Sequence, residues 1–209
     1  MIDRTRYSFI ILNIIHKRQD DIKSQLSMDL LQFFNNKLKF TDEENEVLSN
    51  AFKVEIYAKG TTVVQPNSFV KKVYFVEKGL LRCYYYKEGK DITHFFFDED
   101  TFTAPLNSVF YNKEEAYGWE TLEETTLRVI QYDDLQDLFI KYPSIQRFFF
   151  GVSLDILNAY ALKLEYLQFY TAEERYVNLL ETNPRNLTPY FPRTYCLLFG
   201  YYTTNLKCY

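Results

Sequence analysis

The chain has 209 residues, of which 47% are hydrophobic and 19% aromatic, and its formal net charge is −4. This length suits one domain with a small appendage, and the hydrophobic content is enough for a packed core. Two histidines and three scattered cysteines argue against a histidine-rich metal site and against an iron–sulfur cluster. The acidic balance neither supports nor excludes DNA binding, because a small basic patch can supply it locally.

The cysteines and the apolar stretch near the start of the chain indicate in which cellular compartment the protein is expected. An odd, unpatterned set of cysteines is typical of a reducing compartment, so we expect a cytoplasmic protein. Phe9 to Ile15 is apolar, but this stretch is far shorter than the ~20 residues that cross a membrane. No small-residue cleavage signal follows it. We therefore expect neither a secretory signal nor a membrane partner.

The first predicted element is a helix. Thr41 and Glu44 have the spacing of a capping box, and the acidic residues between them suit the first turn of a helix.

Residues 73–86 and 91–97 are two β-rich runs, VYFVEKGLLRCYYY and DITHFFF, on either side of the turn sequence Lys87–Lys90. Val, Tyr, Phe and Thr suit a pleated, half-buried surface, and Gly89 permits a positive φ in the turn. Gly79 interrupts the first run, as expected at a bend or bulge in a closed β-structure.

Two helices, 133–142 and 144–170, are predicted next, and Pro143 ends the first of them. The longer helix carries two apolar rows with steps of 4, 3, 4 and 3. The first row is Ile145, Phe149, Val152, Ile156 and Ala159. The second row is Phe150, Leu154, Leu157, Ala161 and Leu164. One row can pack on the β-rich part, and the other needs a further surface.

That further surface is either a symmetric partner helix or loops of the same subunit. We favour a homodimer. The residues expected at its interface are Phe149, Val152, Ile156 and Ala159. The predicted fold is α+β: an antiparallel, jelly-roll-like β-roll flanked by helices and followed by a long dimerisation helix.

In this order, the segments resemble the cyclic-nucleotide-binding effector domain of Crp/Fnr-type transcription regulators, over roughly residues 29–184. The resemblance implies a first strand from Phe52 to Ala58 with a turn at Gly60, and a closing strand over Thr125–Gln131. Three motifs carry the resemblance. Tyr74-Phe75-Val76-x-Lys78-Gly79 is similar to a strand exit of the family, and Phe102-Thr103 stands where its phosphate-binding turn begins. Thr171–Tyr176 is similar to the start of the next helix in Bacteroidetes-type members.

The resemblance also implies a division of the chain. Residues 28–142 correspond to the effector domain, 143–170 to the dimerisation helix, and 171–209 to the remnant of a DNA-binding domain. Residues 1–27 have no counterpart, whereas the sequence from Met28 is similar to a family N-terminus. Residues 1–27 are therefore either a non-native extension or an ordinary N-terminal helix.

The family continues into a helix-turn-helix, which residues 185–209 lack as written. Pro189 and Pro192 interrupt this stretch, and no helical period survives. A one-nucleotide shift of the reading frame after Pro184, with permitted codons, gives QEHIASYLGITPQTLSV. This peptide is similar to the helix-turn-helix of the family. We interpret the tail as the product of a frameshift, with an authentic divergent tail as the alternative.

The residues with which the family holds a cyclic nucleotide are missing. Its Phe-Gly-Glu turn reads Phe102-Thr103-Ala104 here, and the segment that should supply an arginine reads Glu114–Trp119. A phosphate there would lack charge-assisted hydrogen bonds, so we expect no cyclic nucleotide and no other cofactor. An unknown small-molecule effector could use a different set of side chains. That set is Thr103, Asn107, Ser108, Tyr117, Trp119, Asn158 and Tyr160. The alternative is that these are wall and core residues.

Three other features have ordinary interpretations. Arg82 is interpreted as a solvated strand residue, and His94 as a strand histidine rather than a haem ligand. The run Asp98–Asp100 is interpreted as a surface turn rather than a metal site. No catalytic constellation is found, so we do not expect an enzyme.

The predicted function is that of a Crp/Fnr-like transcription regulator. Its effector domain has a degenerate cyclic-nucleotide pocket, and it would read DNA only if the intact frame were restored. The alternative is a stand-alone ligand-binding or protein-interaction module of the same fold.

Overall fold

The computed structural model describes residues 30–171 and 174. Residues 27–162 form one compact unit. The predicted extension 1–27 and the stretch 185–209, in which the frameshift is inferred, lie outside the described residues. Thr171 and Glu174 make the two reciprocal bonds of a capping box, with N···O distances of 2.7 Å and 3.3 Å, where the next helix was predicted to start.

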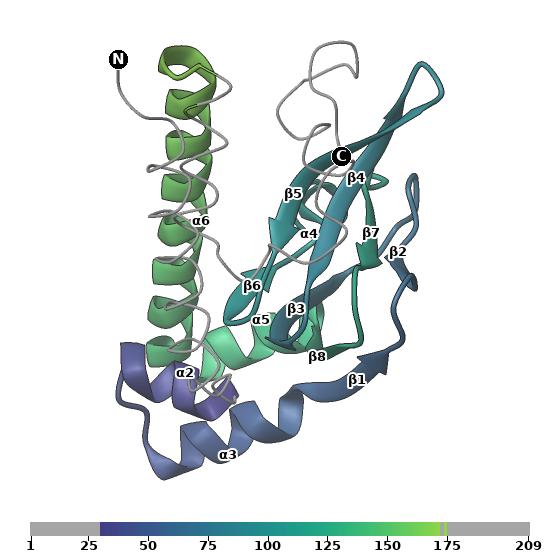
Figure 1. Ribbon diagram of the computed structural model, residues 1–209. Helices are drawn as coiled ribbons and strands as arrows, with labels where there is room; N and C mark the ends of the chain where they lie inside the picture. Colours follow the sequence, from purple (N-terminus) through teal and green to yellow (C-terminus); the bar gives the residue numbers. More distant parts are fainter. Residues whose placement is uncertain (1–29, 172–173, 175–209) are drawn as a thin grey trace, which may run out of the picture. The chain divides into compact units, whose positions relative to one another are not determined.

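The described chain contains two four-stranded antiparallel sheets (Figure 1). Sheet one has the order β1 (Lys53–Tyr57), β8 (Thr125–Gln131), β3 (Lys72–Lys78) and β6 (Thr101–Thr103). Sheet two has the order β2 (Thr62–Val64), β7 (Gly118–Thr121), β4 (Leu81–Lys87) and β5 (Lys90–Phe97). This arrangement confirms the predicted α+β fold with an antiparallel β-roll.

Gly79 is the point at which the chain passes from sheet one to sheet two, so the predicted run 73–86 is two strands rather than one bent strand. Its φ is +98°, in a region that side chains disfavour. A Cβ atom added here would lie 2.7 Å from the carbonyl oxygen of Glu124 and 2.9 Å from the Cα of Thr125. Both the backbone angle and the close approach therefore require glycine.

The β4–β5 hairpin follows the predicted turn. Glu88 and Gly89 both have positive φ, 53° and 73°, as in the type I′ turn that suits the twist of a hairpin. The register then shifts by one residue, because Cys83 pairs with Phe95 but Tyr84 pairs with Thr93. His94 is the extra residue of this bulge, which aims its side chain differently from those of its neighbours.

Five helices are described: α2 (Leu30–Lys37), α3 (Asp42–Ala51), α4 (Leu106–Tyr111), α5 (Tyr132–Lys141) and α6 (Pro143–Phe169). Thr41 and Glu44 form the predicted capping box, with N–H···O distances of 2.8 Å and 3.2 Å. The two predicted helices after the roll are confirmed as α5 and α6. Among the described helices, none is long and apolar enough to cross a membrane.

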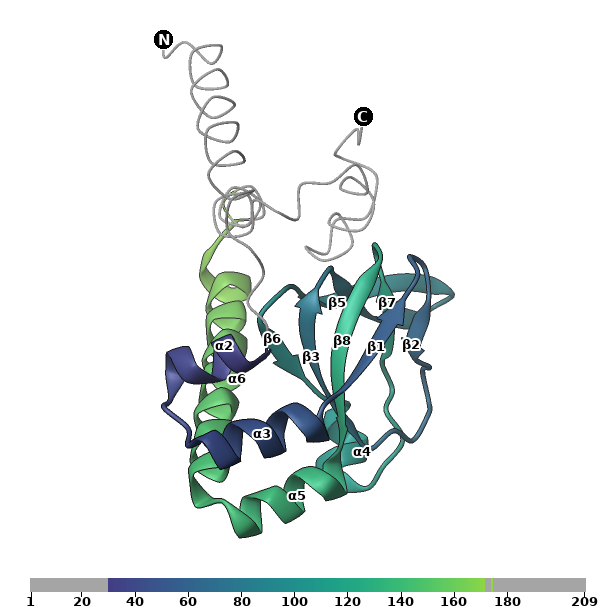
Figure 2. The same ribbon diagram turned by 90° about the horizontal axis from the view of Figure 1, so that it is seen from below.

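The helices and the outer face of sheet one share an apolar cluster rich in phenylalanine, which we call the helical core. Figure 2 shows α2 and α3 beside the first part of α6. Its buried residues are Leu30, Phe33, Phe34, Phe40, Leu48, Phe52, Val73, Phe75, Phe102, Ile130, Leu135, Tyr142, Ile145, Phe148, Phe149 and Val152. Many of these rings meet edge to face, as aromatic quadrupoles favour.

A second apolar cluster involves both sheets, and we call it the roll core. Its buried residues are Val64, Tyr74, Val76, Leu81, Cys83, Trp119, Leu127 and Val129. Strand β3 serves both clusters by alternation: Val73 and Phe75 lie in the helical core, whereas Tyr74 and Val76 lie in the roll core. This double burial explains why β3 reads as a continuous apolar run.

Candidate functional site

The segment from β6 to β7 contains most of the predicted effector residues. Strand β6 ends at Thr103, and after Pro105 the short helix α4 begins. Helix α4 ends at Asn112, whose φ of +52° reverses the chain, and the N–H of Lys113 donates to the carbonyl of Asn107 at 3.0 Å. The chain therefore turns back on α4 before entering β7.

Glu115 lies at the centre of this segment and is only 4% exposed. Its carboxylate accepts the backbone N–H and the side-chain amide of Asn107, both at 3.2 Å. It also accepts the backbone N–H of Tyr117 at 3.4 Å. One buried carboxylate thus joins the first turn of α4 to the residues that lead into β7.

The backbone of the same residue is bonded to a distant part of the chain. The N–H of Glu115 donates to the carbonyl of Ser68 at 2.8 Å, and the N–H of Asn67 donates to the carbonyl of Glu115 at 2.6 Å. Ser108 is fully buried, and its hydroxyl donates to the carbonyl of Lys113 at 3.0 Å. The predicted pair Asn107 and Ser108 therefore lies in a closed network of hydrogen bonds.

Tyr117 continues this network into a group of aromatic side chains. Its ring stacks on that of His94, with the centroids 4.8 Å apart, and it meets Tyr85 edge to face at 5.7 Å. The bulge described above brings His94 to this position. His94 is therefore a strand residue with aromatic neighbours, as predicted.

Tyr160 brings α6 to the same side of the roll, because its ring lies 5.0 Å from that of Phe95. Burial raises the pKa of the Tyr160 phenol, and electrostatic interactions with Cys83, Tyr117 and Glu115 raise this pKa further. Burial also raises the pKa of Tyr117, with Cys83, Tyr85 and Glu115 contributing. The predicted residues Tyr117 and Tyr160 are thus connected through the rings of His94 and Phe95.

The other predicted effector residues are placed differently. Trp119 is 3% exposed in the roll core, where it meets Tyr74 edge to face at 5.3 Å. Thr103 is also buried and pairs with Tyr74 in the sheet. Asn158 is exposed on α6. For Trp119 and Thr103 the wall-and-core alternative fits their burial better than contact with a ligand.

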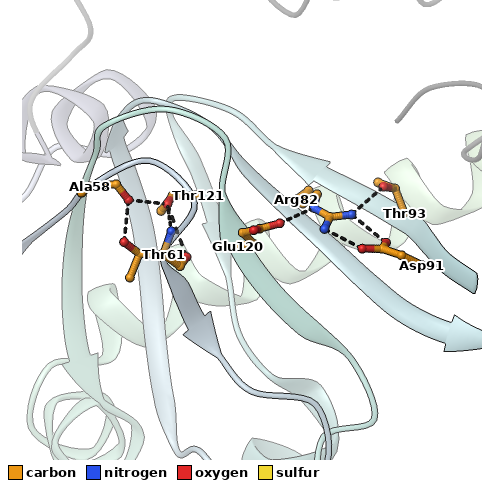
Figure 3. A network of polar contacts seen from close by, with 7 residues as sticks. All are labelled: Ala58, Thr61, Arg82, Asp91, Thr93, Glu120 and Thr121. Atoms are coloured by element: carbon orange, nitrogen blue, oxygen red, sulfur yellow. Dashed lines mark hydrogen bonds and ion pairs between the residues drawn. The ribbon is translucent and has the colours of Figure 1, made fainter. Parts of the chain in front are cut away.

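Arg82 corrects one interpretation made from the sequence. Its side chain is only 14% exposed and makes a bidentate pair with Asp91, both N···O distances being 2.7 Å (Figure 3). Its Nε donates to Glu120 at 2.7 Å, and Tyr84 lies beneath its guanidinium. Burial alone would lower the pKa of Arg82, but the bonds with Asp91 and Glu120 raise it overall. Arg82 is therefore not a solvated strand residue, because its charge is neutralised within sheet two.

Figure 3 also shows the contact between the β1–β2 turn and β7. The hydroxyl of Thr121 donates to the carbonyl of Ala58 at 2.7 Å and accepts the N–H of Thr61 at 2.9 Å. The N–H of Gly60 donates to the carbonyl of Thr121 at 2.8 Å. The predicted turn at Gly60 is confirmed, and its polar groups bond within the roll.

The predicted interface residues on α6 divide into two kinds. Phe149 and Val152 are both 9% exposed, since they belong to the helical core. Ile156 is half-buried against the same core, and Ala159 is exposed. The chain itself therefore covers most of the first row. The exposed row is the second, with Phe150 at 65%, Leu154 at 49% and Leu157 at 64% exposure.

Two features of the site had no clear signal in the sequence. Glu115 was expected to repel a phosphate, but not to bond Asn107 from a buried position. The bidentate pair of Arg82 with Asp91 was not expected either. No local pattern indicated it, because Arg82 pairs with Phe96 in the register of β4 and β5, whereas Asp91 pairs with Tyr86, four residues farther along β4.

The comparisons with known proteins agree with this architecture. A family model described as "Cyclic nucleotide-binding domain" matches residues 54–142. No curated protein matches the sequence.

Several solved structures are similar. The catabolite activator protein of Thermus thermophilus is 18% identical, with a TM-score of 0.54 over 72% of this chain and 71% of that chain. FixK2 of Bradyrhizobium japonicum is 18% identical, with a TM-score of 0.56 over 65% of this chain and 67% of that chain. CLP of Xanthomonas campestris, described as a c-di-GMP responsive global regulator, is 18% identical, with a TM-score of 0.55 over 68% and 71%.

At such identities the likeness concerns the fold alone. The described chain has the α+β fold of a cyclic nucleotide-binding domain and is structurally similar to regulators of the Crp/Fnr family.

Proposed function

We propose that this chain is the effector and dimerisation part of a Crp/Fnr-like transcription regulator, acting in the cytoplasm as a homodimer. The observation that carries the proposal is the exposed second row of α6. Phe150, Leu154 and Leu157 are each about half exposed or more, on a helix that directly follows the cyclic-nucleotide-binding fold. A continuous apolar row on a soluble surface marks an interaction site.

A second copy of the chain is the partner that this row fits best. Its steps of 4, 3, 4 and 3 are those of the a and d positions of a coiled coil, in which one helix packs against an equivalent helix. A two-fold axis beside α6 would bury the row against itself. The interface is accordingly proposed for the second row. Ala159, which completes the first row, lies on the opposite side of the helix.

We infer that the effector is not a cyclic nucleotide. The described roll has Thr103 and Ala104 in place of the Gly and Glu of the family, and Glu115 is buried where an arginine would be needed. A cyclic phosphate there would forgo charge-assisted bonds worth ~1.5–3 kcal/mol each. The effector is an unidentified small molecule, and Asn107, Tyr117 and Tyr160 remain its candidate contacts.

Calorimetry with cAMP tests the inference that the effector is not a cyclic nucleotide. No binding is expected up to the millimolar range, because the field of Glu115 opposes the phosphate. A micromolar dissociation constant would contradict this part of the proposal without touching the dimer.

DNA binding is proposed only for the frame-restored chain. As written, residues 185–209 have Arg185, Arg193 and Lys207 as their cations, too few for the multiple phosphate contacts that give affinity. Restoring the frame after Pro184 would supply a recognition helix. A dimer carrying two such helices would read a two-fold symmetric site with half-sites about one helical turn apart.

Two measurements test the proposal. Light scattering at tens of micromolar should give the mass of a dimer. A mobility-shift assay on the upstream region of the gene should show sequence-specific binding by the frame-restored chain and not by the chain as written, at equal salt. Equal specific binding by both forms would refute the frameshift account.

If the other frame holds no helix-turn-helix, the second candidate function stands. The protein would then be a stand-alone ligand-binding or protein-interaction module. The absence of a helical period in residues 185–209 as written is the observation that favours it. The nucleotide sequence downstream of codon 184 decides between the two.

A further inference from the structure

Glu115 is the only buried residue with a charged side chain in the described part of the chain. Burying a carboxylate is costly unless it is bonded or paired. Here all its partners are N–H donors of Asn107 and Tyr117, and no ion pair with a described cation involves it. The hydrogen-bond partners of its carboxyl group are therefore amide N–H groups, inside the region assigned to the effector.

The contacts of Glu115 lie at the two ends of one segment. Asn107 is in the first turn of α4, and Tyr117 immediately precedes β7. Between them the chain reverses at Asn112 and is closed further by the bond from Lys113 to Asn107. Without the carboxylate, the backbone N–H of Asn107 and that of Tyr117 would each need another acceptor.

We propose that the Glu115 carboxylate is an autoinhibitory contact that keeps the 105–118 segment closed when no effector is bound. It occupies, from within the chain, the donors of Asn107 and Tyr117 that an incoming molecule would use. An effector that bonds to Asn107 must displace the carboxylate, and its binding therefore releases the segment. This inference rests on the proposed sensing function.

A chain of aromatic contacts connects the 105–118 segment to α6, so a release of the segment would reach this helix. Tyr117 stacks on His94, and His94 meets Phe95 edge to face with the ring centroids 5.9 Å apart. The ring of Phe95 in turn lies 5.0 Å from that of Tyr160 on α6. Moving Glu115 would therefore disturb the rings between the segment and α6. The dimer helix would sense the state of the segment through Tyr117 and Tyr160.

Hydrogen exchange in the absence of any ligand tests the contact. In the full chain, amides over 106–117 should exchange slowly. In Glu115→Ala they should exchange about tenfold faster or more, because buried donors lose their acceptor. Amides of β3 and β8 should keep the wild-type rate. Glu114→Ala, at the exposed neighbouring position, is the matched control and should leave every rate unchanged.

Chemical rescue separates a displaceable contact from a merely structural one. Acetate, compared with chloride at equal ionic strength, should restore slow exchange of residues 106–117 in Glu115→Ala and have no effect on the wild type. Rescue shows that an outside carboxylate can take the place of the tethered one. Exchange that stays fast in acetate, or slows equally in chloride, would refute the autoinhibitory role.

A second variant covers the event that Glu115→Ala does not fold. Glu115→Gln keeps the size of the side chain but replaces one of the two accepting oxygens with an amide NH2 group, which cannot accept a hydrogen bond. The exchange rate of residues 106–117 should therefore lie between those of the wild type and Glu115→Ala. Wild-type exchange in both variants would also refute the proposal. Neither readout depends on dimer mass or on DNA, so a failure here is distinguishable from a failure of the proposed function.

Discussion

The two apolar rows of α6 have the same spacing and similar composition, yet they meet different surroundings. Phe149 lies in the helical core at 9% exposure, whereas the next residue, Phe150, is 65% exposed. Phe149 packs against Phe102, Phe139 and Phe148 with ring centroids 5.2–5.4 Å apart. The difference teaches that periodicity identifies apolar rows, while the tertiary structure decides which of them the subunit covers.

The sharpest test of this comparison is the matched pair Phe149→Ala and Phe150→Ala. Removing the buried ring should cost about 3–5 kcal/mol of unfolding free energy, since it leaves a cavity in the helical core. Removing the exposed ring should change the unfolding free energy of the monomer by less than about 0.5 kcal/mol. Urea unfolding at low protein concentration measures both. Equal losses would mean that the two rows are equally buried.

Leu157→Glu tests the second row directly. A carboxylate in a helix–helix seam would be desolvated without a partner, so the dimer should dissociate. The unfolding free energy of the monomer should stay nearly unchanged, because Leu157 is 64% exposed. Sedimentation velocity at several concentrations gives the mass.

The control for Leu157→Glu is Asp155→Ala. Asp155 lies two residues earlier, on the opposite side of the helix, and its ion pair with Lys37 at 2.5 Å is largely exposed. Losing this pair should cost little, and the dimer should persist. A monomer with Asp155→Ala, or a dimer with Leu157→Glu, would place the interface elsewhere.

The smallest expected effect concerns the first turn of α6, where the hydroxyl of Ser144 donates to the carboxylate of Glu44 on α3. Hydrogen bonds from Ser144 and from the backbone N–H of Thr41 lower the pKa of Glu44 below its ordinary value of 4.5. The stability contributed by the ionised form is therefore complete above that ordinary value and is lost as pH falls through the lower, folded-state pKa.

Glu44→Gln should remove this acid sensitivity. The wild type should exceed the variant by up to ~1 kcal/mol at neutral pH, because Glu44 is only partly buried and solvent screens it. The gap should narrow as pH falls below the ordinary value of 4.5. Urea midpoints of both proteins across this range measure it, and a gap that widens in acid would show that Glu44 is not the group responsible.

The elements of the fold could be predicted from the sequence because their signals are local. Gly60, Gly79 and Gly89 mark turns with φ of +76°, +98° and +73°, and each follows a β-rich run. Thr41 and Glu44 mark a helix start within four residues. Such signals depend on backbone angles and neighbouring side chains, which a sequence shows directly.

The site could be predicted only in part, because its contacts join distant residues. Ser68 meets Glu115 in an isolated bridge although they are far apart in the sequence, and Arg82 on β4 meets Glu120 on β7, 38 positions later. Trp119 was predicted among the effector residues, but its side chain is buried in the roll core, against which Tyr117 also packs. Burial of this kind depends on which strands pair.

The ion pairs of Arg82 with Asp91 and Glu120 have a consequence for how the strands of sheet two align. Arg82 on β4 bonds to Asp91 on β5 and to Glu120 on β7, so its two ion pairs depend on the alignment of β4 with both neighbouring strands. A slip of one residue in either pairing would turn the opposing carboxylate to the other face of the sheet. The guanidinium would then be left poorly solvated without its partner, at a high cost in free energy. The two ion pairs of Arg82 therefore favour the native alignment of β4 with both neighbouring strands over an alignment slipped by one residue.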